Sequence, residues 1–241
     1  MRKAWQNLPN GKIGDGMQAI VIAENSEERE FLSYILRHTG LAVARTALVK
    51  QVLGSLLKQP VDLILLSAKS GTAVSDDVAA VRTMSQAPLL LLHDPLTEDA
   101  TCELLDAGVD LILERPYSSR ILARYVTVFL RRAGSVPVSI LTTIQSEQIS
   151  LDPATRTVML ADNPAQPLTP LEFRLLYVLM SNADQVIPTE VIIERVWGYS
   201  GDGNRELVRG LVRRLRRKIE PDPHQTTFIH NHPGVGYRFS A

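Results

Sequence analysis

The chain of 241 residues has one cysteine, no long apolar run and no excess of either charge. A single cysteine, Cys102, excludes an internal disulfide and fits a reducing compartment. No apolar stretch approaches the roughly 20 residues that cross a bilayer, and no signal-peptide pattern begins the chain. We therefore expect a cytoplasmic protein without a membrane partner. Because 26 Lys and Arg residues balance 26 Asp and Glu residues, a polyanion would have to be recognised by a local cluster of charge.

The first half of the chain lacks glycine where a nucleotide site would need it. Short apolar runs at 19–23, 62–66, 89–92 and 110–113 alternate with helical patterns, and 42–45 offers a fifth strand. Such runs fit strands buried on both faces of a parallel sheet. We predict a doubly wound α/β domain of five strand–helix units over residues 18–133. The first strand–helix turn, 23–26, contains no glycine, which excludes a phosphate-cradling loop.

Residues 204–219 combine an apolar stripe of helical period with a dense cluster of cations. Seven cations stand off that stripe against one anion, Glu206. They are Arg205, Arg209, Arg213, Arg214, Arg216, Arg217 and Lys218. A helix that packs on one side and is cationic on the other suits the major groove of DNA, although many soluble helices carry a solvated arginine face.

The surrounding pattern predicts a winged helix. Thr169 to Glu172 reads as a capping box with proline at the first helical position, and a second helix begins near Thr189. Short strands are expected within 147–168. Two further strands, at 226–231 and 237–239, are joined by residues 232–236, whose glycines we expect to supply positive φ. A cationic helix followed by a terminal hairpin can place the helix in the groove and the hairpin on the backbone.

Four segments, LTPLEFRLLYVL, ERVWG, VRRLRRKIEP and GVGYRF, occur in this order. With them, residues 146–241 resemble the winged-helix effector domain of OmpR/PhoB response regulators. The resemblance implies a four-stranded sheet, three helices, a C-terminal hairpin and duplex DNA as ligand. It places Arg209, Gly210, Arg213, Arg214 and Arg217 at the groove. The full expected DNA-contacting set is Arg205, Arg209, Gly210, Arg213, Arg214, Arg216, Arg217 and Tyr237. Pro233 departs from the arginine that the family often has before the first wing glycine.

The first half then resembles a response-regulator receiver with a degenerate site. We divide the chain into a flexible leader (1–17), a receiver-like domain (18–133), a linker (134–143) and a winged-helix domain (144–241). Where receivers hold an acidic pair, a phosphoacceptor Asp, a Thr or Ser and a Lys, this chain has Ala23 and Glu24, Ser67, His93 and Arg115. Without the nucleophilic carboxylate and one metal-binding acid, the family's phosphoryl chemistry has no route. We expect a pseudo-receiver with no bound metal or cofactor.

Two readings give these polar residues another role. Ser67, His93 and Glu24 invite a hydrolytic triad, but no G-x-S-x-G elbow surrounds Ser67, and we do not expect an enzyme. A small anion held by Arg115 and His93 is the second reading.

Receivers of this class usually dimerise through one face, and this chain has opposite charges on its two parts. The residues expected there are Asp99, Glu103, Asp106, Asp110, Arg120, Arg124 and Arg131. We predict a phosphorylation-independent homodimer that binds double-stranded DNA at tandem half-sites, with RNA polymerase as a further candidate partner. The alternatives are a regulator that responds to phosphorylation or a ligand through a nonstandard site, and a protein-interaction adaptor whose DNA binding has decayed.

Overall fold

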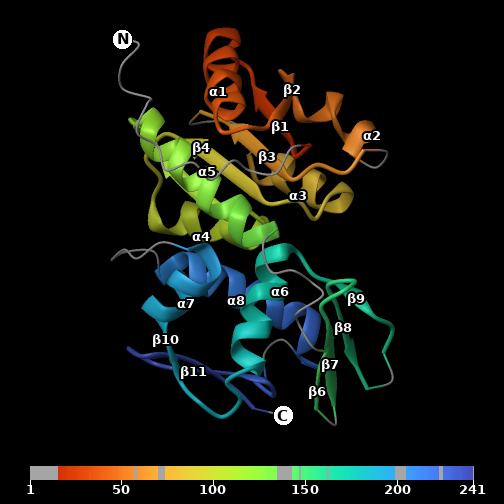
Figure 1. Ribbon diagram of the computed structural model, residues 1–241. Helices are drawn as coiled ribbons and strands as arrows, with labels where there is room; N and C mark the ends of the chain where they lie inside the picture. The colour runs from red at the N-terminus through yellow and green to blue at the C-terminus, as the bar shows by residue number, and fades with distance from the viewer. Residues whose placement is uncertain are drawn as a thin grey trace.

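Two domains lie one above the other in the computed structural model (Figure 1), which describes residues 16–56, 59–69, 74–134, 143–146, 148–161, 163–198, 205–222 and 225–240. Most of the predicted leader and linker lie outside the described residues. At the end of the leader, the backbone oxygen of Met17 accepts a hydrogen bond from Ala42 at 2.9 Å, so Met17 is already part of the first domain.

The N-terminal domain is built on a parallel sheet of five strands in the order β2-β1-β3-β4-β5. Its elements are β1 (Gln18–Ala23), α1 (Ser26–His38), β2 (Ala42–Thr46), η1 (Val49–Gln51), α2 (Leu53–Leu56), β3 (Leu63–Ser67), α3 (Val74–Met84), β4 (Leu89–His93), α4 (Glu98–Ala107), β5 (Leu111–Glu114) and α5 (Ser119–Gly134). The predicted doubly wound domain of five strand–helix units is confirmed.

Alternation along the central strands explains the apolar runs. In β3, Leu63 and Leu65 join one buried cluster while Ile64 and Leu66 join the cluster on the opposite face. Because successive side chains of a strand point to opposite faces, a strand covered by helices on both sides must be apolar throughout. Helix α1 is capped by Asn25, whose side chain accepts from the Glu28 amide at 2.9 Å.

The C-terminal domain has the predicted four-stranded sheet, three helices and hairpin. Its elements are β6 (Ile144–Gln145), β7 (Ile149–Asp152), β8 (Thr157–Leu160), β9 (Gln166–Pro167), α6 (Pro170–Met180), β10 (Ile187–Pro188), α7 (Thr189–Trp197), α8 (Arg205–Ile219), β11 (Ile229–His232) and β12 (Gly236–Phe239). Strands β6-β7-β8-β9 form one antiparallel sheet, and β10-β12-β11 form another. The predicted capping box at the start of α6 is present in both directions between Thr169 and Glu172.

The hairpin β11–β12 uses its two glycines differently. Gly234 has φ +77°, as its predicted turn role requires. Gly236 does not have a positive φ, contrary to prediction; instead, a Cβ added there would lie 1.9 Å from the backbone oxygen of Ile187. Strand β12 therefore pairs with β10 at a distance that glycine alone permits at this position.

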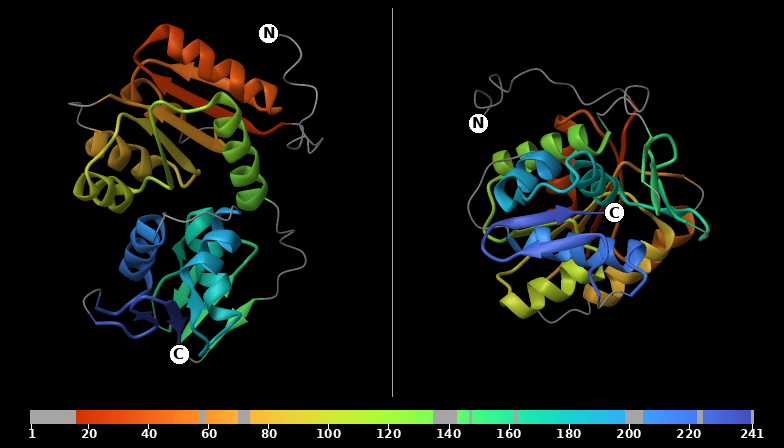
Figure 2. Two further views of the ribbon diagram at one scale, coloured as in Figure 1. Left: turned by 90° about the vertical axis from the view of Figure 1, so that its left-hand side faces the viewer. Right: turned by 90° about the horizontal axis from the view of Figure 1, so that it is seen from below.

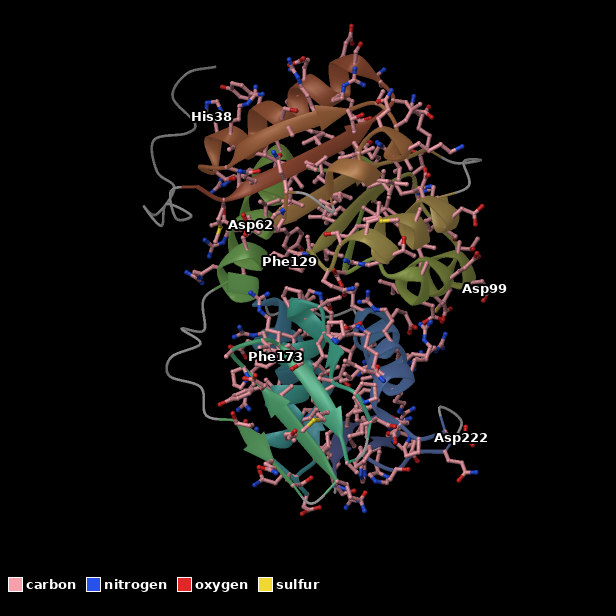
Figure 3. All side chains as sticks on the ribbon, turned by 90° about the vertical axis from the view of Figure 1, so that its right-hand side faces the viewer. His38, Asp62, Asp99, Phe129, Phe173 and Asp222 are labelled. Atoms are coloured by element: carbon pink, nitrogen blue, oxygen red, sulfur yellow. The ribbon has the colours of Figure 1, made fainter. Side chains whose placement is uncertain are left out.

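The two domains share one apolar core. Figure 2 shows helices of both domains facing each other across the junction, and α4 contacts α8 while α5 contacts α6 and α7. Phe129 of α5 and Phe173 of α6, labelled in Figure 3, belong to the same buried cluster. Within the described residues, no helix combines the length and apolar character that crossing a bilayer requires.

Candidate nucleic-acid interface and receiver-like site

Helix α8 holds the predicted cationic cluster on a buried apolar spine. Val208, Leu211 and Leu215 are fully buried in the shared core. The side chains of Arg205, Arg209 and Arg213 are each 59% exposed. One side of the helix therefore packs, and these three arginines lie on its exposed side.

The middle of α8 lies directly against α4 of the receiver-like domain. A Cβ added at Gly210 would lie 2.7 Å from the Cβ of Leu105, so the absence of a side chain allows the close approach. Arg213 forms an ion pair with Asp106, and Arg217 Nη2 donates to the backbone oxygen of Asp106 at 2.8 Å. Two residues matched to the groove-facing set are therefore engaged with the other domain.

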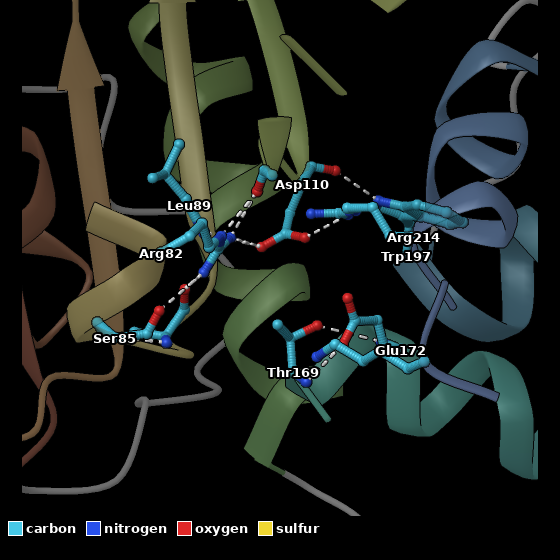
Figure 4. A network of polar contacts seen from close by, with 11 residues as sticks. Arg82, Ser85, Leu89, Asp110, Thr169, Glu172, Trp197 and Arg214 are labelled. Atoms are coloured by element: carbon cyan, nitrogen blue, oxygen red, sulfur yellow. Dashed lines mark hydrogen bonds and ion pairs between the residues drawn. The ribbon is translucent and has the colours of Figure 1, made fainter. Parts of the chain in front are cut away.

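A buried network around Asp110 joins the domains (Figure 4). Asp110 is 1% exposed and accepts from Arg82 Nη2 at 2.6 Å, from Arg214 Nη2 at 2.8 Å and from the Leu89 amide at 3.0 Å. Its backbone oxygen accepts from Trp197 Nε1 at 2.9 Å. Burial alone would raise the pKa of Asp110, but the guanidinium groups of Arg82 and Arg214 outweigh it and hold the pKa below its ordinary range.

Four of the predicted site residues are placed differently from expectation. Arg214 is 7% exposed and points to Asp110, and Gly210 is buried under Leu105, so neither faces solvent in this arrangement. Arg216 Nη2 donates to the backbone oxygen of Ile229 at 2.7 Å and so braces the hairpin. Tyr237 is 8% exposed in β12, and burial raises its pKa. Tertiary packing sets the position of each of these four residues. Sequence spacing alone does not reveal that packing.

Some residues of the predicted dimer face are exposed, whereas others contact the C-terminal domain. Asp99 at the edge of α4 (Figure 3) and Glu103 are exposed, as are the side chains of Arg120, Arg124 and Arg131 on α5. Asp106 is paired with α8. For Asp110 the expectation of a surface acid was wrong, because it lies between the domains.

Two glutamates that the sequence reading did not assign to the site fix the geometry of α8. The buried Glu220 accepts from the backbone amides of Thr227, Phe228 and Ile229 at 2.8 to 3.2 Å, which ties the end of α8 to the hairpin. Glu172 accepts from Lys218 Nζ at 2.7 Å and thereby links the α6 cap to α8. Glu220 directly follows the apolar stripe, in the IEP segment, and Glu172 was visible through its capping box.

At the carboxyl ends of the parallel strands, Arg115 occupies the receiver-like site. Its Nη2 donates to Ser67 Oγ at 2.5 Å and to Glu28 Oε1 at 2.9 Å, and its Nη1 donates to the backbone oxygen of Ala68 at 2.8 Å. Nη1 also lies 3.4 Å from Asp94 Oδ1. Sequence reasoning did not identify Glu28 as a partner. Because protein acceptors already engage this guanidinium, an anion would have to displace them, which disfavours the predicted anion reading for Arg115.

The remaining polar residues of the receiver-like site make separate contacts. The buried His93 places Nδ1 2.7 Å from the backbone oxygen of Asp94, whereas the hydroxyl of Ser67 meets Arg115. Glu24 is exposed and lines a cavity of about 450 Å³ beside Ser67, and Ala23 is buried. Within the part of the chain that the structure describes, no three His, Cys, Asp or Glu residues are grouped to hold a metal ion.

Comparisons with known proteins agree with this architecture. Residues 163–239 match the family described as "Transcriptional regulatory protein, C terminal". The chain is 30% identical to the DNA-binding response regulator MtrA of Mycobacterium tuberculosis over 220 residues, covering 91% of this chain and 95% of MtrA. It is 29% identical to the KDP operon transcriptional regulatory protein KdpE of Escherichia coli, covering 92% and 99%.

A solved mutant of RitR matches 93% of this chain and 99% of its own, with a TM-score of 0.75 and 21% identity, which establishes the likeness of fold. Three findings together identify the family: the parallel five-stranded domain, the winged helix, and relatives that match over nearly their whole length. The chain belongs to the OmpR/PhoB family of DNA-binding transcriptional response regulators.

Proposed function

We propose that this regulator binds specific DNA sequences as a homodimer on tandem half-sites, and that it does so without aspartyl phosphorylation. The observation that carries the second part is the position of Arg115 between Ser67 and Glu28. Ser67 ends β3 where receivers hold the carboxylate nucleophile, and its hydroxyl accepts a hydrogen bond from Arg115, so the site lacks the group that would carry an aspartyl phosphate.

DNA binding by α8 requires the two domains to separate. Gly210 and Arg214 are covered by the receiver-like domain, while Arg205 and Arg209 are exposed. A groove-bound helix presents its whole cationic side to the duplex. The apparent affinity of the chain for DNA is therefore the affinity of the open arrangement reduced by the fraction of molecules that are open.

The homodimer is proposed to form through the exposed part of the predicted face. Asp99 and Glu103 on α4 and the three arginines on α5 offer opposite charges that a two-fold axis can bring together. Asp106 can join them once Arg213 has left it. The same acid would then exchange an intramolecular partner for an intermolecular one, so opening and dimerisation support each other.

A ligand-responsive form of this function has one supporting observation. The cavity of about 450 Å³ beside Ser67 lies at the carboxyl ends of the strands, where open α/β sheets bind ligands. A small molecule seated there would contact η1 and the end of β3.

Site selection from random duplexes tests the proposal. The full-length protein, untreated, is expected to enrich a direct repeat with half-sites about one helical turn apart. Addition of acetyl phosphate and Mg²⁺ is expected to change neither the motif nor the affinity, and Ser67→Ala is expected to behave as the natural chain. Intact-mass measurement should show no added phosphoryl group. Enrichment that appears only after treatment with the phosphodonor would refute phosphorylation independence, and none under either condition would favour the adaptor alternative.

A further inference from the structure

The cleft between the two domains carries more positive than negative charge. It has a volume of about 230 Å³ and lies where the end of α4 meets α6 and α8, beside the network of Figure 4. Its walls contain Arg82 from the receiver-like domain and Arg214, Arg217 and Lys218 from the effector domain, against Asp106 and Glu172. Both domains therefore contribute cations to one cleft, which is open to solvent.

The ion pairs around this cleft do not balance. Asp110 faces two guanidinium groups, Arg82 and Arg214, whose side chains are 12% and 8% exposed. Glu172 is matched by Lys218, and Asp106 by Arg213. Arg217 donates to a backbone oxygen, which carries no charge. Among these described residues five cations meet three carboxylates, but Arg213 and Arg217 are exposed, so the buried excess is one charge: Arg82 and Arg214 share the single carboxylate of Asp110. An uncompensated buried charge is strongly unfavourable.

Specific atoms at the cleft also lack partners. Nε and Nη1 of Arg214 are buried and make no hydrogen bond with any residue that the structure describes. Oδ1 of Asp106 is also buried and accepts no hydrogen bond from any residue that the structure describes. Because these atoms are shielded from water, a ligand in the cleft bonds to them only after the side chains of Arg214 and Asp106 turn toward it. A ligand that matches both must accept several hydrogen bonds, carry negative charge and donate one hydrogen bond.

We propose that this cleft binds hydrogen phosphate, as the free ion or as the phosphoryl group of a small ester, and that the anion bridges the two domains. Arginine and lysine together supply the charge and the fork of donors that a phosphoryl oxygen set accepts. The hydroxyl of hydrogen phosphate, or of the monoanion of a phosphate ester, can donate to Asp106, which sulfate cannot do. The volume is below that of most organic ligand sites and holds roughly seven waters' worth of space, so it suits a small oxyanion with a few waters.

The bridging position gives the anion a consequence for DNA binding, and this consequence rests on the proposed function. Arg214 and Arg217 belong to the set matched to the groove, and the anion holds them against the receiver-like domain. Phosphate therefore stabilises the closed arrangement and opposes release of α8. Only a ligand that prefers one arrangement shifts such an equilibrium, and this one requires cations from both domains.

Calorimetric titration of the full-length protein tests the site without DNA. Inorganic phosphate is added in a chloride buffer of constant ionic strength, with sulfate and glycerol phosphate as parallel titrants. We expect saturable binding of phosphate, weaker binding of sulfate, and about tenfold weaker phosphate binding in Arg217→Gln, since one charged hydrogen-bond donor is lost. Arg217→Lys should retain most of the affinity. Arg205→Gln removes the same charge from the same helix outside the cleft and should bind as the natural chain does.

Tryptophan fluorescence provides a second readout at the junction. In a Trp5→Phe background, Trp197 reports the contact with Asp110, and its emission should follow the phosphate titration. Tighter binding of the ester than of the free ion would assign the site to a phosphorylated metabolite, within the same proposal. Absence of saturable binding, equal loss in Arg217→Gln and Arg205→Gln, or equal affinity for sulfate would overturn it. Phosphate binding in a protein that selects no DNA motif would instead refute the proposed function alone.

Discussion

Replacement of Asp110 by asparagine is expected to raise the affinity of the full-length chain for its DNA site by about tenfold or more. The substitution keeps the shape of the side chain and removes the one carboxylate that faces both Arg82 and Arg214. Loss of one partner from a buried ion pair typically destabilises a structure by about 3–5 kcal/mol. Part of this loss falls on the receiver-like domain, because Arg82 belongs to it, and the remainder shifts the chain toward the open arrangement.

Fluorescence anisotropy with a selected duplex measures the gain, and small-angle scattering measures the opening. Asp106→Asn is the matched control. Asp106 is 27% exposed, and a pair of this kind contributes about 1 kcal/mol or less, so a smaller gain is expected. Circular dichroism should show that the Asp110→Asn chain is folded. Unchanged scattering and unchanged DNA affinity in a folded Asp110→Asn chain would contradict the requirement for domain opening.

Acid pH, well below neutrality, is expected to weaken the contact between the domains at Asp110. The folded pKa of Asp110 is held below its ordinary value by Arg82 and Arg214, which outweigh the opposing effect of burial. A carboxyl of this kind contributes stability in full above its unfolded pKa, which is about 4, and the contribution is lost as the pH falls through the lower folded value. The contact between domains is therefore expected to be independent of pH from about 5 to 8.

The second large effect is expected from Glu220→Gln, which should lower the free energy of unfolding by about 2–4 kcal/mol. The Glu220 carboxylate accepts from three consecutive backbone amides, those of Thr227, Phe228 and Ile229. An amide side chain offers one oxygen and turns an NH₂ group toward donors. Since Ile229 begins β11, the hairpin loses its fixed position relative to α8, and DNA affinity should fall as well.

Urea denaturation followed by circular dichroism measures the loss, and Glu190→Gln is its control. Glu190 also makes an ion pair with an arginine of α8, but it is 57% exposed, so its replacement should change stability by less than about 1 kcal/mol. Equal effects of the two substitutions would show that Glu220 stabilises the fold no more than a surface acid does.

Most of the fold could be predicted from local patterns in the sequence. The apolar runs of β3 and β4 are long enough, and bounded closely enough, to predict parallel strands before any contact is known. Thr169 and Glu172 predict the start of α6 because both halves of a capping box lie within one turn. The cationic helix was predicted to within one residue of α8, since its period and its charge agree.

The contacts that were missed join residues distant in sequence. Arg115 and Glu28 are 87 positions apart, and Arg214 and Asp110 are 104 apart. Helical spacing says which side of α8 is cationic, but it does not say that a second domain covers part of that side. One signal was available: Asp110 stands between the apolar residues Val109 and Leu111, where a charge must find a partner. Gly236 gave no such signal, because its role depends on the approach of β10.

The continuity of the apolar core through both domains makes opening a thermal event as well as an electrostatic one. Leu105 and Phe129 share one buried cluster with Trp197 and Leu211, so separation of the domains brings apolar surface into water. Hydration of such surface carries a positive heat capacity. The enthalpy of DNA binding by the closed chain therefore includes the enthalpy of exposing the junction, which grows with temperature, whereas a permanently opened chain lacks this contribution. Because the hydrophobic contribution weakens on cooling, low temperature favours release of α8.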